Sequence, residues 1–381
     1  MRKGIKRFLL CTSSVILTAS GVICAAVRLA SAGFPASLEI AAAEMAMPIG
    51  NAEYQENETS DFNSDSETSE TNTDSDTSAD TSHENSKSSN KIPQKSSGGF
   101  EASDPDEKEL EEYRSSHKGE EQYPVNEFNA TKGNISYKNV QVKNTASTDI
   151  DIKSELQAEL GFKITKTDQP QVLIYHTHTT ESYLPYDTGY FYESFFPRTT
   201  DEHQNVCAVG EEIAKELNRR GIVTIHDTTL HDYPSYNGAY DRSLETINKY
   251  LEKYPSIKVV LDIHRDGIGT DTEKSKPVFT AEGRKAAQIM ILSGYNYDGC
   301  EEFRDWEYNL RFALRLQDAA SKKYPEMVRA LNFSDFMYNM NVNTGSLLIE
   351  VGAESNTVEE ARYSGYLLGG ILSEVLNNNK N

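Results

Sequence analysis

Short apolar runs alternate with amphipathic segments along the second half of this 381-residue chain. The apolar runs have the length and the β-branched content of strands, and we predict five: 172–175, 222–226, 257–264, 286–294 and 346–352. The segments between and after them carry helical patterns: 206–217, 243–254, 306–314 and 357–376. Strands that alternate with helices favour an α/β fold with a mainly parallel sheet flanked by helices on both faces.

The last predicted helix has clear signals at its start and along one side. Thr357 is a suitable N-cap, and Glu359 and Glu360 lie in the first turn, where the helix dipole favours acidic side chains. Three glycines in the same helix indicate close packing against a neighbouring element and not phosphate binding: Gly365, Gly369 and Gly370.

The N-terminus has the pattern of a membrane segment. Arg2, Lys3, Lys6 and Arg7 precede an uncharged run at 8–27, which is long enough to cross a bilayer as a helix with its cationic end in the cytoplasm. We predict that residues 1–30 are a single-pass membrane anchor, although small residues at 30–32 leave cleavage as a signal peptide open. In either case the rest of the chain lies outside the cytoplasm.

The next segment, 31–122, is poor in apolar residues and rich in Ser, Thr, Asp and Glu, as in "SDSETSETNTDSDTSADTSHENSKSSNK". Such a composition buries too little apolar surface to offset the entropy of ordering, so we predict a disordered acidic linker. A strand-rich lead-in at 123–170 and a catalytic domain at 171–381 follow it.

The charge argues against a nucleic-acid-binding protein, and the cysteine content argues against a protein held by disulfides or by a cysteine-rich metal site. The formal net charge of −21 comes largely from the linker and argues against nucleic acid as a partner. Cys11 and Cys24 lie in the hydrophobic run, whereas Cys207 and Cys300 are single and far apart in the sequence. This spacing gives neither a disulfide framework nor a cysteine-rich metal site.

Side chains that can bind metal lie at the carboxyl ends of predicted strands. The run "VLIYHTHTTESY" ends a strand with His176 and His178, and the next candidates, His264 and Glu350, end two others. Parallel α/β sheets place functional groups at these ends. If the first strand continues past Tyr175, its two histidines point to the same face and could share one metal. The alternative is that they are ordinary hydrogen-bonded strand-end histidines.

Acidic residues accompany these histidines. Asp262 and Asp266 flank His264 and could orient it or bind metal, or else the three residues form a solvated edge. Glu350 ends an apolar strand, where burial raises the pKa of a carboxylate and suits it to accept and return a proton, unless it pairs with an arginine. Two histidines and a carboxylate around zinc, with a further glutamate beside the water, would form a hydrolase site.

A polar aromatic loop, "HDYPSYNGAYDR" at 231–242, could bind sugar or peptide, or could be a turn fixed by Pro234 and Gly238. The candidate substrate-binding residues are Tyr233, Tyr236, Tyr240, Arg242 and Arg265.

Five ordered motifs resemble the stage II sporulation protein P family: "YHTHTTESY", "VGEEIAKELNRRGI", "HDYPSYNGAYDRSLETINKYL", "YPSIKVVLDIHRDG" and "LLIEVGAESNT". The resemblance covers about residues 170–378. These are membrane-anchored peptidoglycan hydrolases of endospore formers, related to zinc-dependent N-acetylmuramoyl-L-alanine amidases. The resemblance implies a zinc amidase-like fold and cleavage between N-acetylmuramic acid and L-alanine, with cleavage of peptide cross-links also attributed to the family. It further implies a role in engulfment, a mother-cell membrane location facing the septal wall, and stage II sporulation proteins D and M as partners.

The resemblance also implies roles for single residues. It places one zinc ligand at His176 or His178, a second at His264, and the catalytic base at Glu350. The related amidases have a ligating glutamate just before the first helix, a register that falls near Glu202 and His203. Glu181 is the alternative ligand, because its loop can curl back.

In the hydrolysis that we predict, zinc activates water and stabilises the oxyanion, while Glu350 takes a proton and returns it to the leaving amine. Two alternatives stay open: an anchored wall-binding scaffold without turnover, and a zinc peptidase that cleaves only cross-links.

Overall fold

The computed structural model describes residues 99–270 and 272–379, which all belong to one compact unit of the chain, 82–381. The predicted anchor at 1–30 and most of the predicted linker lie outside the described residues. Among the residues described, no helix combines the length and the hydropathy needed to cross a membrane.

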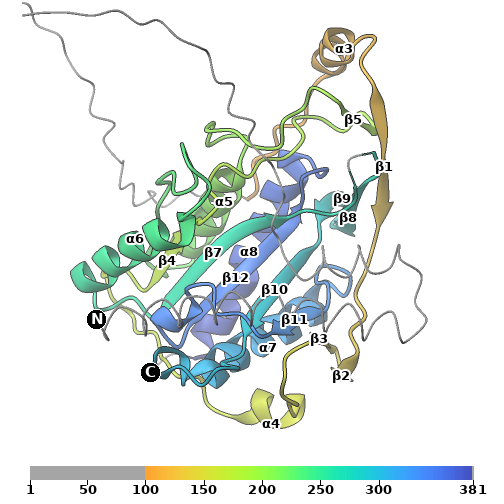
Figure 1. Cartoon of the computed structure of the whole chain (residues 1–381). Coiled ribbons are helices and arrows are strands. Elements are labelled where there is room, and N and C mark those ends of the chain that lie inside the picture. The colour runs from red at the N-terminus through yellow and green to blue at the C-terminus, as the bar shows by residue number, and fades with distance from the viewer. Residues whose placement is uncertain (1–98, 271, 380–381) are drawn as a thin grey trace, which may run out of the picture. The chain divides into compact units, whose positions relative to one another are not determined.

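An eight-stranded sheet forms the centre of the domain (Figure 1). Its strands, in spatial order, are β2 (Ile135–Tyr137), β3 (Val140–Asn144), β11 (Leu331–Ser334), β10 (Ile289–Gly294), β12 (Ser346–Ala353), β7 (Val259–Asp266), β4 (Val172–Tyr175) and β6 (Thr224–His226). Neighbouring strands are parallel except in the pairs β2–β3 and β10–β12. The prediction of a mainly parallel sheet is therefore confirmed.

Helices cover both faces of this sheet, but unevenly. The side chains of Val172 and Ile174 belong to the core that includes α5 (Val206–Arg219), α7 (Trp306–Lys323) and α8 (Val358–Asn377). The alternate residues Leu173 and Tyr175 pack on the opposite face with α6 (Ala239–Lys253). Short 3-10 turns, η1 (Glu301–Phe303) and η2 (Met340–Val342), also lie on that second face, where Phe303 and Met340 pack against strand residues.

Helices α5 and α8 pack closely, as the glycines of α8 predict. A Cβ on Gly365 would lie 2.8 Å from the carbonyl oxygen of Val209, and one on Gly369 would lie 3.0 Å from that of Ile213. Thr357 caps α8 and forms a capping box with Glu360, so the predicted helix start is confirmed.

A second, smaller sheet was not predicted. Its order is β5 (Tyr190–Tyr192), β1 (Gln122–Phe128), β8 (Lys274–Ala281) and β9 (Arg284–Ala287). The single strand predicted at 286–294 is divided between β9 of this sheet and β10 of the large one. The lead-in likewise joins both sheets through β1, β2 and β3, and it also contributes α4 (Ile152–Gln157).

The end of the predicted linker is ordered, which corrects its boundary. Residues 107–116 form helix α3 (Glu107–Ser116), which begins with a capping box between Asp106 and Glu109. Upstream of it, the ring of Phe100 packs 5.0 Å from that of Tyr363 on α8. Ser103 donates to Glu359 and Asp104 pairs with Arg284 at 2.6 Å, so polar contacts and aromatic packing together hold this segment to the domain.

A buried lysine joins the small sheet to the start of α8. Lys276 Nζ lies 2.8 Å from Asp187 Oδ2, 3.0 Å from Glu360 Oε1 and 3.3 Å from Glu127 Oε1, and its side chain is 2% exposed. Because the buried carboxylate of Glu360 would lose its paired charge, we expect Lys276→Met to lower the free energy of unfolding by about 3 kcal/mol. Urea denaturation of the two proteins measures this difference.

Lys285→Met is the matched control, since Lys285 pairs with the same Glu127 and Asp187 but is 42% exposed, and it should cost less than about 1 kcal/mol. Burial raises the pKa of Asp187, but its bond to Lys276 outweighs burial and leaves the pKa below its ordinary value. The stabilisation that comes from the Asp187–Lys276 pair is present above the ordinary pKa of Asp187, and it is lost as pH falls through the lowered pKa. The difference in free energy of unfolding between wild type and Lys276→Met should therefore become smaller below about pH 4. Equal losses in both lysine variants would contradict this account.

Candidate metal and catalytic site

The carboxyl ends of β4, β7 and β12 bring the site residues together. Strands β12 and β7 are parallel neighbours, with Glu350 directly beside His264 in the register. On the other side of β7, Tyr175 at the end of β4 is the partner of Asp262. The convergence expected from the strand ends is therefore present for His264 and Glu350.

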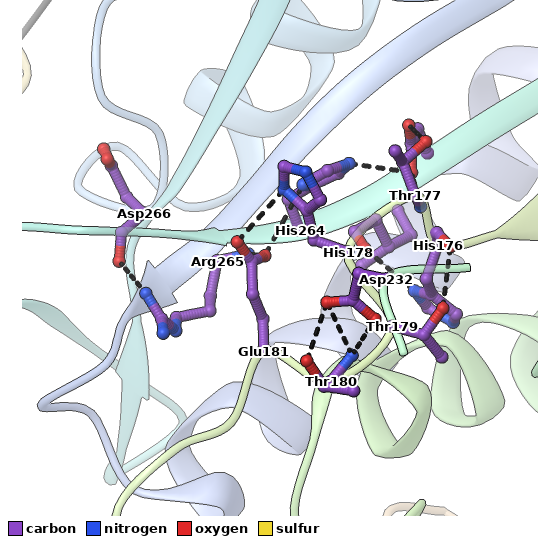
Figure 2. Close-up of polar contacts among 12 residues, drawn as sticks. His176, Thr177, His178, Thr179, Thr180, Glu181, Asp232, His264, Arg265 and Asp266 are labelled. Carbon is purple, nitrogen blue, oxygen red and sulfur yellow. Dashed lines mark hydrogen bonds and ion pairs between the residues drawn. The ribbon is translucent and has the colours of Figure 1, made fainter. Parts of the chain in front are cut away.

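Three buried side chains near these ends form a group that could hold a metal: His178, Glu181 and His264. His178 Nδ1 lies 3.4 Å from Glu181 Oε1, and His264 Nδ1 lies 3.5 Å from Glu181 Oε2 (Figure 2). The chain turns back after His178, with the amide of Glu181 bonded to the carbonyl of His178 at 3.1 Å. This turn brings the carboxylate between the two imidazoles.

The donor atoms fit zinc. One ligand atom from each residue lies within 4.8 Å of the others, and each imidazole faces a different oxygen of the Glu181 carboxylate, at 3.4 and 3.5 Å. Tetrahedral zinc bonds of about 2.0–2.2 Å place neighbouring donor atoms about 3.3–3.6 Å apart, so small shifts of these side chains would complete the site. Two imidazole nitrogens and one carboxylate, with a position left for water, are the ligands of catalytic zinc sites. The pKa of Glu181 lies well below its ordinary value because the two imidazoles outweigh the effect of burial, which raises it. The carboxylate is therefore ionised and ready to bind a cation.

Asp262 lies behind His264 and not in the metal group. Its Oδ1 is 2.8 Å from His264 Nε2, and it accepts bonds from the amide of Thr177 at 2.8 Å and from the Thr177 hydroxyl at 2.7 Å. The pKa of His264 is raised well above its ordinary value, because Asp262 and then Glu181 outweigh burial, which lowers it. Of the two roles predicted for Asp262, the structure shows the contact needed to orient His264.

Glu350 is a buried carboxyl group beside this centre. It is 4% exposed, and its Oε2 has no hydrogen-bond partner among the described residues. Burial, followed by the charges of Asp266 and Glu181, raises the pKa of Glu350 to about 8. The arginine that could have neutralised it, Arg329, instead pairs with Asp266 at 2.7 Å. Asp266 therefore acts on Glu350 through its charge and is not part of the metal group.

His176 does not join His178, contrary to the expectation from strand geometry. Strand β4 ends at Tyr175, so the alternation of faces stops before the two histidines. The ring of His176 instead bonds the carbonyl oxygen of Ile263 at 2.8 Å and faces His226. Burial, followed by the charge of His226, lowers the pKa of His176 to about 3.

Glu202 and His203, the candidates from the amidase register, also lie apart from the metal group. Both side chains are exposed, and Glu202 accepts a bond from the hydroxyl of Thr228 at 3.1 Å. In the described residues the carboxylate near both imidazoles follows β4, and the side chains of Glu202 and His203 before α5 are not in the metal group. Glu181 is the carboxylate that the structure places between His178 and His264.

Aromatic rings line the centre on the side of the 231–242 loop. Tyr236 stacks on His178 with ring centroids 4.6 Å apart, and Tyr240 meets the same imidazole edge-on at 5.5 Å. Tyr338, which the sequence did not single out, stacks on Tyr240 at 5.4 Å. Tyr236 and Tyr240 therefore support His178 directly, while Tyr233 is 58% exposed.

The two arginines predicted to bind substrate are engaged elsewhere. The guanidinium of Arg242 donates to the backbone carbonyls of His231, Ser235 and Asn237, which fixes the loop. Arg265 is buried and donates from its side chain to the carbonyls of Ser182 and Pro197, and from its amide to Glu181 Oε2 at 3.2 Å. Backbone carbonyls hold both side chains in the structure, and those of Arg242 agree with the alternative interpretation of the 231–242 loop as a fixed turn.

One basic residue near the centre was missed. Arg198 lies with its Nη2 3.8 Å from Glu181 Oε1, forms an ion pair with Asp232 at 2.8 Å, and has its guanidinium 4.8 Å from the ring centre of Tyr236. It sits in an irregular segment before α5, where periodicity gives no signal.

Fold and site together define an α/β protein with a candidate metal-hydrolase centre at the carboxyl ends of its strands. The chain belongs to the Stage II sporulation protein P family, whose model matches residues 30–373, and the resemblance noted in the sequence is confirmed. Stage II sporulation protein P of Bacillus subtilis (strain 168) is 28% identical over 225 residues, which cover 56% of this chain. The match spans about half of that relative, 53% of its length.

Solved structures with a similar arrangement include three amidases. N-acetylmuramoyl-L-alanine amidase AmiC2 of Nostoc punctiforme is 11% identical, with a TM-score of 0.33, and the match covers 55% of this chain and 96% of that one. An N-acetylmuramoyl-L-alanine amidase from Clostridium difficile 630 is 16% identical, with a TM-score of 0.33 and coverages of 56% and 97%. The CwlD amidase from Clostridioides difficile, solved in complex with the GerS lipoprotein, is 12% identical, with a TM-score of 0.32 and coverages of 55% and 99%.

Proposed function

We propose that this protein is a zinc-dependent peptidoglycan hydrolase of endospore formation that cleaves the amide between N-acetylmuramic acid and L-alanine. The observation that carries the proposal is the position of Glu350 beside His264, which belongs to the group of His178, Glu181 and His264. Glu350 is buried, and its Oε2 has no hydrogen-bond partner among the described residues. Membership of the Stage II sporulation protein P family supports the choice of substrate.

Each residue of the site has a separate task in this reaction. His178, Glu181 and His264 would hold zinc, which when bound supplies a Lewis acid for the water and for the scissile carbonyl. Glu350 accepts a proton from the attacking water and returns it to the amine that leaves. Asp262 keeps His264 in place, and the amide of Arg265 holds the Glu181 carboxylate.

The same site could also cleave peptide cross-links, as the family resemblance implies. A scaffold without turnover is less well supported, because a buried carboxyl group whose Oε2 has no partner among the described residues lowers stability. We further propose that residues 1–30 anchor the chain to the mother-cell membrane, and that it works in engulfment with stage II sporulation proteins D and M.

The test is digestion of purified peptidoglycan by the full chain, with and without a chelator, followed by mass spectrometry of the soluble products. We expect released peptides with a free L-alanine amine, loss of release with the chelator, and recovery on adding zinc. Cleaved cross-links with stem peptides still attached to glycan would favour the peptidase alternative. Chelator-insensitive release would contradict the assignment of zinc, and no release at all would favour the scaffold.

A further inference from the structure

A second group of metal-binding side chains lies apart from the proposed catalytic centre. It consists of His176 after β4, His226 at the end of β6 and Cys207 in the first turn of α5. One ligand atom from each side chain lies within 4.8 Å of the others, and all three residues are buried. The proposed hydrolysis uses none of these three residues, and the family resemblance offers only His176, as the alternative to His178.

Hydrogen bonds orient the rings of His176 and His226 so that their Nε2 atoms face each other. Nδ1 of His176 lies 2.8 Å from the carbonyl oxygen of Ile263, and Nδ1 of His226 lies 3.4 Å from a carboxylate oxygen of Glu211. Both partners can only accept, so both Nδ1 atoms donate, and in neutral rings both Nε2 atoms carry lone pairs. These Nε2 atoms are 2.8 Å apart, a contact that needs either a shared proton or a cation between them.

The backbone of helix α5 approaches both nitrogens closely. A Cβ on Gly210 would lie 2.5 Å from His226 Nε2 and 2.8 Å from His176 Nε2, so a larger residue at this position would clash with both imidazoles. Cys207 lies three residues before Gly210 and Glu211 directly after it, so one stretch of the helix supplies the thiol, the glycine that lets the rings pack against the backbone, and the acceptor for His226.

We propose that His176, His226 and Cys207 form a second metal site that binds a zinc ion, independently of the hydrolytic activity proposed above. Two imidazoles and a thiolate are typical zinc ligands. Zn–N bonds of about 2.0–2.1 Å require the two Nε2 atoms, now 2.8 Å apart, to separate by about half an ångström when the ion binds. The ion ties β4, β6 and α5 together, just before the turn that carries His178 and Glu181. Its role is to fix that turn.

Cobalt substitution of the full chain tests the site, because only a thiolate ligand gives a sulfur-to-cobalt charge-transfer band in the near ultraviolet. The His178, Glu181 and His264 group has no sulfur, so the band reports the second site alone. We expect it in wild type, in Cys300→Ser, which removes the other free thiol of the described chain, and in His178→Ala. We expect it to disappear in Cys207→Ser, which should also bind about one zinc ion per chain fewer than Cys300→Ser.

Wild-type protein that binds cobalt without a sulfur band would overturn the proposal without any variant having to fold. A band that survives in Cys207→Ser would belong to another thiol and would overturn it equally. Equal zinc contents in folded Cys207→Ser and Cys300→Ser, checked by circular dichroism, would show that His176 and His226 share a proton instead.

Discussion

Replacing Glu350 with glutamine should reduce peptide release about 10²–10⁴-fold while zinc stays bound. The amide keeps the size of the carboxyl group but cannot take a proton from water, and Glu350 lies beside His264 of the proposed metal group without being a member of that group. Peptide release from purified peptidoglycan measures the activity, and metal analysis of the same sample measures the bound zinc.

The pH profile gives this prediction a second measurement. Burial and the neighbouring acids raise the pKa of Glu350 to about 8 in the metal-free protein, and a bound dication favours the carboxylate and lowers that pKa. Because the base must be ionised, the rate should fall as pH drops through the pKa of Glu350, and the residual activity of Glu350→Gln should lack this limb.

Glu354→Gln is the matched control, since Glu354 follows in the same segment but pairs with Lys274 at 2.7 Å. Its rate should stay within about threefold of wild type, because the carboxylate of Glu354 pairs with Lys274 and Arg265 and is not a member of the metal group. Full activity in Glu350→Gln, or an equal loss in both variants, would remove Glu350 from the role of base.

The sequence predicts the parts of the fold that depend on local pattern. Apolar runs and helical spacing identify the strands around the site, and the start of α8 follows from Thr357 and its neighbours. The small sheet could not be predicted, because β1 and β8 pair across about 150 residues of sequence and β8 contains Lys276 and Pro277. Pairing over that distance depends on tertiary contacts, such as the buried ion pairs of Lys276.

Strand ends predict which site residues lie together, whereas in the turn after β4 the sequence could offer Glu181 only as one of two alternatives. His264 and Glu350 lie at the ends of neighbouring parallel strands, so their proximity follows from the α/β order. His176 was grouped with His178 on the assumption that β4 continues, whereas the strand ends at Tyr175. After that residue, alternation no longer tells which way a side chain points.

Glu181→Gln and Glu202→Gln together decide which carboxylate completes the metal centre. The Glu181 carboxylate faces both imidazoles at 3.4 and 3.5 Å and is held by the amide of Arg265. Substitutions outside the ligand shell typically weaken metal binding about 10–100-fold, so loss of a charged ligand should weaken zinc binding by more than about 100-fold. Glu202 is exposed and bonded to Thr228, and its substitution should change zinc affinity less than about twofold.

Competition with a chromophoric chelator measures both affinities, and a Cys207→Ser background confines the titration to the His178, Glu181 and His264 group. The two variants carry the same chemical change, and they differ in whether the carboxylate faces the imidazoles. A loss confined to Glu202→Gln would return the third ligand to the segment before α5, as in the amidase register, and would require that segment to move toward His264 when metal binds. A loss confined to Glu181→Gln means that this chain builds its metal centre from one short turn after β4, together with His264 of β7.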